Sequence, residues 1–255
     1  MKLTFNDIID THKGKVGLSV ATGPSLKPHL SNIINLSNNE GYVALSVNDF
    51  DVMFKGLNVS YRIVANSTFT VGSEYNRFNK EPKIPLVYAD SVDLTSKEAV
   101  NELLKIDYLP YDQRHFDGKH CTWGDGVDGR YYCCGNIEEG RLTIQEELRK
   151  YCGVDFIYGA GDTVSLHMLS FNILLGCNPI YIVGVDLDYS KGYADGVSRN
   201  DDSFAPYIDR ILKDFETIKK SAENIGVEIY SLSKDSPINN VFKYVETIET
   251  NKNNI

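Results

Sequence analysis

Short runs of β-prone apolar residues recur along the chain, and each run stops at polar residues. The runs cover residues 16–21, 42–47, 59–65, 84–88, 180–185 and 228–231. Between them lie segments whose apolar positions recur at helical spacing, at residues 26–36, 96–105, 163–176 and 206–224. Strands that alternate with helices build a mostly parallel sheet with right-handed crossovers. The pattern therefore predicts an α/β fold, a Rossmann-like and mostly parallel sheet with helices on both faces.

Two segments depart from this alternation. Residues 107–141 are rich in aromatic residues and glycine and have no sustained period, which predicts a long irregular insertion. Loops of this length are usually functional. Near the C-terminus, Ser236 and Pro237 form a predicted turn, and a short helix is expected after them. Because no linker divides the chain, we expect one domain over residues 1–255, with the insertion at about 107–141.

Composition narrows the function classes. The 255 residues include 26 Lys and Arg against 35 Asp and Glu, a net charge of −9, whereas a nucleic-acid-binding protein usually presents a basic face. The apolar runs are shorter than the roughly 18 to 20 residues that a membrane span needs. Five cysteines without a regular framework, and a start unlike a signal peptide, fit a reducing compartment. We therefore expect a cytoplasmic protein with no nucleic-acid partner and no integral membrane segment.

Polar clusters follow four of the predicted strands, at the point where each strand ends. These clusters are Thr22-Gly23-Pro24-Ser25, Asn48, Asn66 and Asp186-Leu187-Asp188-Tyr189. Ligands of parallel α/β sheets bind beyond the carboxyl ends of the strands. The clusters could therefore converge on one cleft.

The loop around Gly23 fits either a nucleotide site or an ordinary turn. Glycine lets a ligand approach the backbone, and Ser25 can cap the next helix while its hydroxyl and amide face a nucleotide. The loop lacks the second glycine of the dinucleotide fingerprint and the lysine–serine pair of a P-loop, which disfavours a conventional NAD or P-loop ATP site. A strand-to-helix turn with a capping serine is the structural alternative.

Asp162 and Thr163 begin the most apolar of the predicted helices. Amides at the positive end of the helix dipole could hold a phosphate or ribose there, although an N-cap is the commoner role of these residue types. His167 lies one turn into this helix on its apolar face. We expect it to be buried and satisfied rather than catalytic.

Asp186 and Asp188 form an acidic pair after the clearest strand. Two carboxylates near a strand end can hold Mg²⁺ or Mn²⁺ against a diphosphate, and strand alternation would place both on one side. Alternatively, one of them caps a loop. Tyr189 and Tyr193 follow, and their phenol groups could donate to a leaving phosphate or simply pack in a chain that has 16 tyrosines.

The insertion contains histidines and cysteines whose spacing disfavours a zinc site. These residues are His115, His120, Cys121, Cys133 and Cys134. The two adjacent cysteines cannot easily both point at one tetrahedral ion, and no C-x-x-C pair is present. Both histidines stay candidate general bases because imidazole titrates near neutral pH. Asp201 and Asp202 are the other candidates, with a solvated loop as their structural alternative.

Two blocks of the sequence resemble a known family. One is the Gly23-Pro24-Ser25-Leu26 loop with the asparagines after the next two strands, within residues 16–65; the other, closer one is residues 162–195. In these blocks the chain resembles bacterial sialyltransferases of the Campylobacter lipooligosaccharide type and the related domain family of 6-hydroxymethylpterin diphosphokinase. The insertion has no counterpart in this resemblance.

The resemblance implies a site for the nucleotide of a CMP-type sugar donor. Asp186 would shape this site, and Tyr189 and Tyr193 match the tyrosines that contact the phosphate, although Asp188 stands where the family has its first tyrosine. The family's base histidine has no match here, because no histidine follows His167. The implied nucleotide contacts are Gly23, Pro24, Ser25, Asn48, Asn66, Thr163, Val164 and Ser165.

Three functions are compatible with these residues. The leading hypothesis is a sialyltransferase-like glycosyltransferase that binds a CMP-type nucleotide-sugar donor and passes the sugar to a small-molecule or glycan acceptor held by the insertion. Its catalytic candidates are Asp188, Tyr189, Tyr193 and His115. The alternative is a diphosphokinase in which Asp186 and Asp188 bind Mg²⁺ while ATP gives its terminal diphosphate to a small alcohol. A nucleotide-binding module that has lost catalysis is the third.

Overall fold

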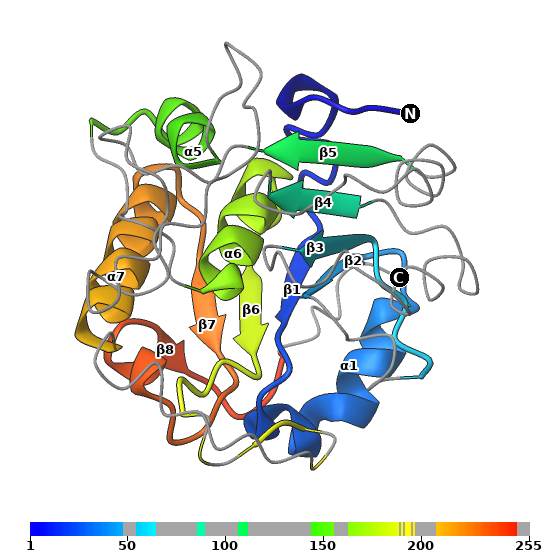
Figure 1. Cartoon of the computed structure of the whole chain (residues 1–255), viewed down its shortest axis with the longest axis vertical. Helices are drawn as coiled ribbons and strands as arrows, with labels where there is room; N and C mark the ends of the chain where they lie inside the picture. The colour runs from blue at the N-terminus through cyan, green and yellow to red at the C-terminus, as the bar shows by residue number, and fades with distance from the viewer. Residues whose placement is uncertain are drawn as a thin grey trace, which may run out of the picture.

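The computed structural model describes residues 1–47, 55–64, 86–89, 107–111, 144–155, 163–188, 190, 192–194, 196 and 208–248. This part of the chain forms a single sheet with helices packed against it (Figure 1). The helix predicted at residues 96–105 and most of the predicted insertion lie outside the described residues.

The described residues form a sheet of eight strands, and every described pair of neighbouring strands is parallel. In chain order the strands are β1 (Val16–Val20), β2 (Tyr42–Val47), β3 (Tyr61–Val64), β4 (Leu86–Ala89), β5 (Tyr108–Tyr111), β6 (Ile180–Val183), β7 (Ile229–Ser231) and β8 (Lys243–Tyr244). Their order across the sheet is β5-β4-β3-β2-β1-β6-β7-β8. The predicted parallel α/β fold is confirmed.

The strand order reverses at the centre of the sheet. From β1 the chain builds outward through β2, β3, β4 and β5, and it then returns to the other side of β1 with β6, β7 and β8. After β1 the chain continues to α1 in one core, and after β6 it continues to α7 in the other, so the carboxyl ends of these two strands form the switch point of the sheet. Ligands of open α/β sheets bind at such a switch point.

Helices cover both faces of the sheet, as predicted. The helices α5 (Ile144–Cys152), α6 (Val164–Leu174) and α7 (Ile208–Asn224) share one apolar core with the sheet, and α1 (Leu30–Ser37) contributes to a second core. Side chains alternate along β6 between the two faces of the sheet, so Ile182 packs in the first core and Val183 in the second. The 3₁₀ helices η1 (Phe5–Asp7), η2 (Pro24–His29) and η6 (Pro237–Asn240) complete the described elements.

The central helix α6 is buried almost all round. Ten of its 11 residues are buried, which a helix without charged residues permits. His167 is among them with no exposed surface, as expected from its place on the apolar face. The helix thereby fixes the position of its own N-terminus relative to the strands β1 and β2, against which it packs.

The structure differs from the predicted elements in four places. Residues 108–111 form the strand β5 rather than the start of an irregular insertion; Pro110 is tolerated there because β5 is an edge strand. The segment after Ser236 forms η6 and the short strand β8 instead of a helix. The helix α5 was not predicted, and the helix expected from residue 26 begins as η2, which contains Pro28.

Candidate nucleotide pocket

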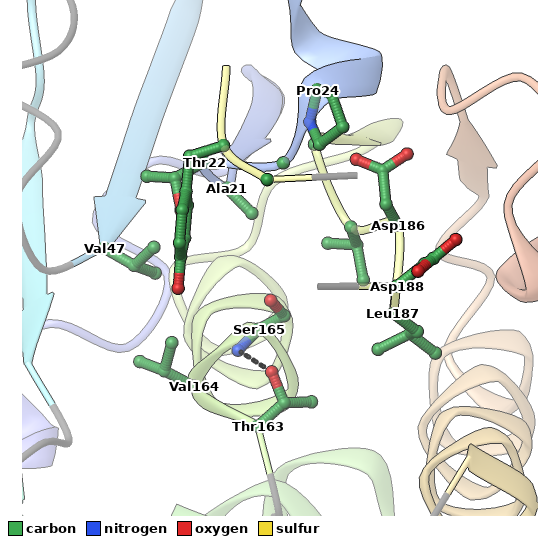
Figure 2. Close-up of a pocket in the computed structure, with 15 residues that line it drawn as sticks. Ala21, Thr22, Pro24, Val47, Thr163, Val164, Ser165, Asp186, Leu187 and Asp188 are labelled. Carbon is green, nitrogen blue, oxygen red and sulfur yellow. Dashed lines mark hydrogen bonds between the residues drawn. The ribbon is translucent and has the colours of Figure 1, made fainter. Parts of the chain in front are cut away.

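A pocket lies at the switch point, beyond the carboxyl ends of β1 and β6 (Figure 2). Three segments converge on it: the loop after β1, the first turn of α6, and the loop after β6. In Figure 2 the first lies above the α6 N-terminus and the last lies beside it. The lining residues are Ala21, Thr22, Gly23, Pro24, Val47, Thr163, Val164, Ser165, Gly184, Val185, Asp186, Leu187, Asp188, Gly192 and Tyr193.

The loops after β1 and β6 approach each other closely at two glycines. The Gly23 N–H donates to the Gly184 carbonyl oxygen at 2.8 Å, one step beyond the last strand pairing. A Cβ on Gly23 would lie 2.1 Å from Asp186 Oδ2, and a Cβ on Gly184 would lie 2.3 Å from the Ala21 carbonyl oxygen. Gly184 also has a φ of +75°, which side chains rarely adopt. Both positions therefore require glycine.

Asp186, in the loop after β6, hydrogen-bonds to the loop after β1. Its Oδ2 accepts from the Ser25 backbone N–H at 3.1 Å and from the Ser25 hydroxyl at 3.0 Å. Figure 2 shows the Asp186 carboxylate directed toward Pro24. Ser25 does not line the pocket. The structure thus explains why this loop holds its shape, while direct contact of Ser25 with a nucleotide stays a prediction.

The first turn of α6 faces the pocket with small side chains. The Thr163 Oγ1 accepts from the Ser165 N–H at 3.3 Å, which is the N-cap arrangement considered as the structural alternative (Figure 2). Thr163 and Val164 are half-buried and Ser165 is buried, and all three line the pocket. The positive end of the α6 dipole thus points at the pocket, where it favours an anion.

The two aspartates after β6 do not act as a pair. The strand ends at Val183, so strand alternation does not extend to them, and Leu187 between them has a φ of +54°. Figure 2 shows the Asp188 carboxylate directed away from the α6 N-terminus, whereas Asp186 points toward Pro24. Asp188 Oδ1 accepts from the Ser190 N–H at 3.1 Å and from its hydroxyl, which forms a local loop cap.

As placed, these two carboxylates do not form a preassembled magnesium site. Mg²⁺ prefers several converging oxygen ligands in octahedral geometry. The carboxylates of Asp186 and Asp188 diverge and already bind serine donors, and the described residues include no group of three or more potential ligands. The premise that both carboxylates lie on one side was therefore wrong, and metal binding by them stays a prediction.

Tyr193 reaches the pocket from a loop that is tied to the β1 loop. The N–H of the next residue, Ala194, donates to the Thr22 carbonyl oxygen at 2.8 Å. Tyr193 is half-buried and lines the pocket, and its contact with a phosphate stays a prediction. The remaining predicted site residues lie outside the described residues: Asn48, Asn66, His115, His120, Asp162, Tyr189, Asp201 and Asp202.

Sequence analysis missed several lining residues. Val47 ends β2 and lines the pocket directly before Asn48, and its place at the end of an apolar run was the available signal. Gly184 lies within the predicted apolar run 180–185, and an isolated glycine in a strand pattern is a signal for a close backbone approach. Ser233 does not line the pocket but hydrogen-bonds to Gly184 and Ser25, and no local pattern in its sequence neighbourhood indicates this role.

The charge of the described lining is negative. Its ionisable acids are Asp186 and Asp188, and the described lining residues include no Lys, Arg or His. Backbone N–H groups and hydroxyls are therefore the donors that this part of the site offers to an anion. The described cysteines are not nucleophile candidates, because burial raises the pKa of Cys152 and of Cys177 to about 12.

Comparisons with known proteins found similar folds. No protein-family model and no curated protein matches the chain. The MAf glycosyltransferase from Magnetospirillum magneticum AMB-1 has a TM-score of 0.51 at 12% identity over 89% of this chain and 33% of that chain. The α-2,3-sialyltransferase Cst-I from Campylobacter jejuni has a TM-score of 0.48 at 16% identity over 97% and 88%. The α-2,3-sialyltransferase from Campylobacter jejuni in its apo form has a TM-score of 0.46 at 16% identity, over 93% of this chain and 82% of that chain.

At such low identity, the similarity concerns the fold. The chain has a glycosyltransferase-like α/β fold, and it spans about a third of the MAf chain. The structures named above include no diphosphokinase. Within the described part of the chain, every helix is too short or too polar to cross a bilayer.

Proposed function

We propose that this protein is a glycosyltransferase that uses a nucleotide-sugar donor of the CMP type, bound in the pocket between the β1 loop, the α6 N-terminus and the β6 loop. The observation that carries the proposal is the convergence of these three segments at the switch point of the sheet. The resemblance of the Gly23 loop and of residues 162–195 to bacterial sialyltransferases supports it. The glycosyltransferase-like fold also supports it.

The described lining suits a donor of low negative charge. At its single phosphate a CMP-sugar carries one negative charge, whereas a diphosphate donor carries two on its phosphates and usually brings a metal ion. The N-terminal turn of α6 at Thr163 to Ser165 would hold the phosphate through N–H groups and the helix dipole. Asp186 and Asp188 would accept hydrogen bonds from neutral hydroxyl or amine groups of the donor.

The proposed reaction displaces the nucleotide from the sugar. An acceptor hydroxyl attacks the anomeric carbon, its proton passes to a general base, and the bond to the phosphate oxygen breaks with its electron pair leaving on CMP. Tyr193, and Tyr189 by the same argument, would donate a hydrogen bond to the departing phosphate. The carboxylate of Asp188 and the imidazole of His115 are the candidate bases. The insertion would hold the small-molecule or glycan acceptor.

A thermal-shift panel tests this proposal. The wild-type protein is heated with CMP, CDP, UDP, GDP, ATP and AMP, each with Mg²⁺ and with EDTA. We expect CMP to stabilise it in both conditions, because a ligand at 100 times its dissociation constant adds about 2.7 kcal/mol. Stabilisation by ATP in Mg²⁺ alone would replace the proposal with the diphosphokinase alternative. No stabilisation by any of the nucleotides would overturn nucleotide use altogether.

Donor turnover separates an enzyme from a binding module. If CMP stabilises the wild-type protein, that protein is incubated with CMP-sialic acid, and the release of CMP is measured with and without a glycan acceptor. We expect CMP to be released, and we expect the acceptor to accelerate this release. Binding of CMP without any release would leave the nucleotide site in place and remove the proposed transferase activity.

A further inference from the structure

A buried serine from a third strand end joins the two loops that form the pocket. Ser233 follows β7, has no exposed surface and does not line the pocket. The Gly184 N–H donates to its Oγ at 3.1 Å, and the same Oγ lies 2.9 Å from the Ser25 Oγ. Ser25 in turn binds Asp186. One hydroxyl thus touches both the β6 loop and the β1 loop.

The protons of this network can be assigned from the donors present. Ser25 has one hydroxyl proton and two oxygens within reach, Asp186 Oδ2 at 3.0 Å and Ser233 Oγ at 2.9 Å. Because a carboxylate can only accept, the Ser25 hydroxyl donates its hydrogen bond to Asp186. The Ser233 hydroxyl can then donate to the Ser25 oxygen, while its own oxygen accepts from the Gly184 N–H. Each of these donors thus has an acceptor. Gly184 and Asp186 line the pocket, whereas Ser25 and Ser233 do not.

The segment that carries Ser233 is itself firmly held. The Ser233 N–H donates to Ser231 Oγ at 3.2 Å, and its carbonyl oxygen accepts from Asn239 Nδ2 at 3.0 Å. Ser236 donates its hydroxyl to the Val185 carbonyl oxygen at 2.6 Å. The segment after β7 is therefore anchored to the β6 loop by a second bond. It provides a fixed support for the Ser233 hydroxyl.

We infer that Ser233 is a positioning residue that holds the Gly23 loop and the Gly184 loop in register and thereby sets the nucleotide affinity of the pocket. This inference rests on the proposed function. An alanine at this position lacks the hydroxyl, so the Gly184 N–H would lose its acceptor inside the protein. The Ser25 hydroxyl would also lose its second partner. Both loops contribute lining residues, so their relative shift would alter the pocket without touching a ligand contact.

The variants Ser233→Ala and Ser221→Ala provide a matched comparison. Ser221 is also almost fully buried, but its hydroxyl donates to the Thr217 carbonyl oxygen within α7, away from the pocket. CMP affinity is measured by titration calorimetry, and unfolding is measured by denaturant. We expect S233A to bind CMP about tenfold more weakly and S221A to bind it as the wild type does, although both lose stability. Equal CMP affinity of S233A and the wild type would overturn the inference.

Two further variants separate positioning from general damage. Ser233→Thr keeps the hydroxyl and is expected to bind CMP more tightly than S233A. In a double-mutant cycle, S25A and S233A should be non-additive, because they remove two ends of one hydrogen-bonded chain. Full additivity, or a threonine variant as weak as S233A with an intact fold, would contradict the inference.

A ligand-free measurement keeps this inference apart from the proposed function. Amide hydrogen exchange of Gly184 is followed by NMR in the wild type, S233A and S221A. We expect faster exchange in S233A alone, and an unchanged rate there would overturn the link between the two loops. Absence of CMP binding by the wild type would overturn the proposed function instead, and the exchange rates would still decide whether Ser233 holds the loops together.

Discussion

The two ends of α6 lie in one helix but are closed in different ways. At the C-terminal end, the backbone N–H groups of Asp10 and His12 donate to the carbonyl oxygens of Leu174 and Leu175, each at 2.9 Å, and Gly176 turns the chain away. At the N-terminal end, the cap comes from the side chain of Thr163 itself. Helix ends leave backbone groups without partners inside the helix.

This difference shows how the fold separates structure from function along one element. The C-terminal end is sealed by another part of the backbone, whereas the N-terminal end opens on a pocket that two loops shape. The polar groups available to a ligand are therefore concentrated at the positive end of the helix.

The close approach of the loops at the open end is tested by Gly184→Ala. The new methyl group would meet the Ala21 carbonyl oxygen at 2.3 Å in a conformation with φ of +75°. We expect a loss of at least about 3 kcal/mol in the free energy of unfolding, measured with denaturant. Gly226→Ala is the control, because its φ is +74° and nothing lies within 4 Å of the added carbon. Equal losses in both variants would show that the loops do not meet as described.

The sealed end is tested by Gly176→Ala. Gly176 has a φ of +80°, and a Cβ there would lie 2.8 Å from Asp10 Oδ1 and 3.2 Å from Lys13 Cα. We expect a loss of about 2 kcal/mol in unfolding free energy, because conformational strain adds to crowding of the N-terminal turn. CMP affinity measured by calorimetry should stay that of the wild type. A marked fall in affinity would mean that the two ends are not independent.

The cap at the open end is tested by Thr163→Ala. Loss of the side-chain oxygen removes the acceptor of the Ser165 N–H, and we expect a cost of about 1 kcal/mol in unfolding free energy. Thr163→Ser keeps that oxygen and should retain most of the stability. A serine variant as unstable as the alanine variant would show that the threonine contributes through packing of its methyl group instead of through the cap.

The sealed end should also respond weakly to pH through His12. Burial, with a smaller effect of Lys15, lowers the pKa of His12 below its ordinary value. A histidine with a lowered pKa stabilises the fold above its unfolded-state pKa, and this contribution is lost as the pH falls through the folded-state pKa. Because His12 is half-exposed, we expect a change of less than about 1 kcal/mol.

Melting at pH 7.5 and pH 5.5 in the wild type and in His12→Phe measures this contribution. Phenylalanine keeps an aromatic ring beside Tyr61, whose ring centre lies 5.8 Å from that of His12. The wild type should lose more stability on acidification than the variant. An equal loss in both proteins would remove His12 as the origin of the pH response.

Most of the sheet could be predicted from the sequence, because its strands are short apolar runs that end at polar residues. β2 matches its predicted bounds, and the carboxyl ends of β1 and β6 gather the polar clusters that follow them. β5 escaped prediction because Tyr108-Leu109-Pro110-Tyr111 carries a proline, which only an edge position tolerates. The place of a strand within a sheet is a tertiary property that local pattern does not contain.

The candidate site was predictable in its location but not in its internal bonds. Strand ends indicated Gly23 and Asp186, and a helix start indicated Thr163; all three line the pocket. The link from Ser25 to Ser233 joins residues 208 positions apart, and the divergence of the two aspartates depends on the backbone of Leu187. Such contacts arise from the packing of three strand ends, so no periodicity along the chain indicates them.

The most direct test of nucleotide binding at the open end of α6 is calorimetric titration of CMP into Val164→Glu. Val164 lines the pocket in the first turn, where a glutamate suits the helix dipole but would repel a phosphate. Val154→Glu is the matched control, because Val154 is also half-buried but does not line the pocket. We expect one CMP to bind to the wild type and to V154E, and none to bind to V164E. Wild-type affinity in a folded V164E would contradict it.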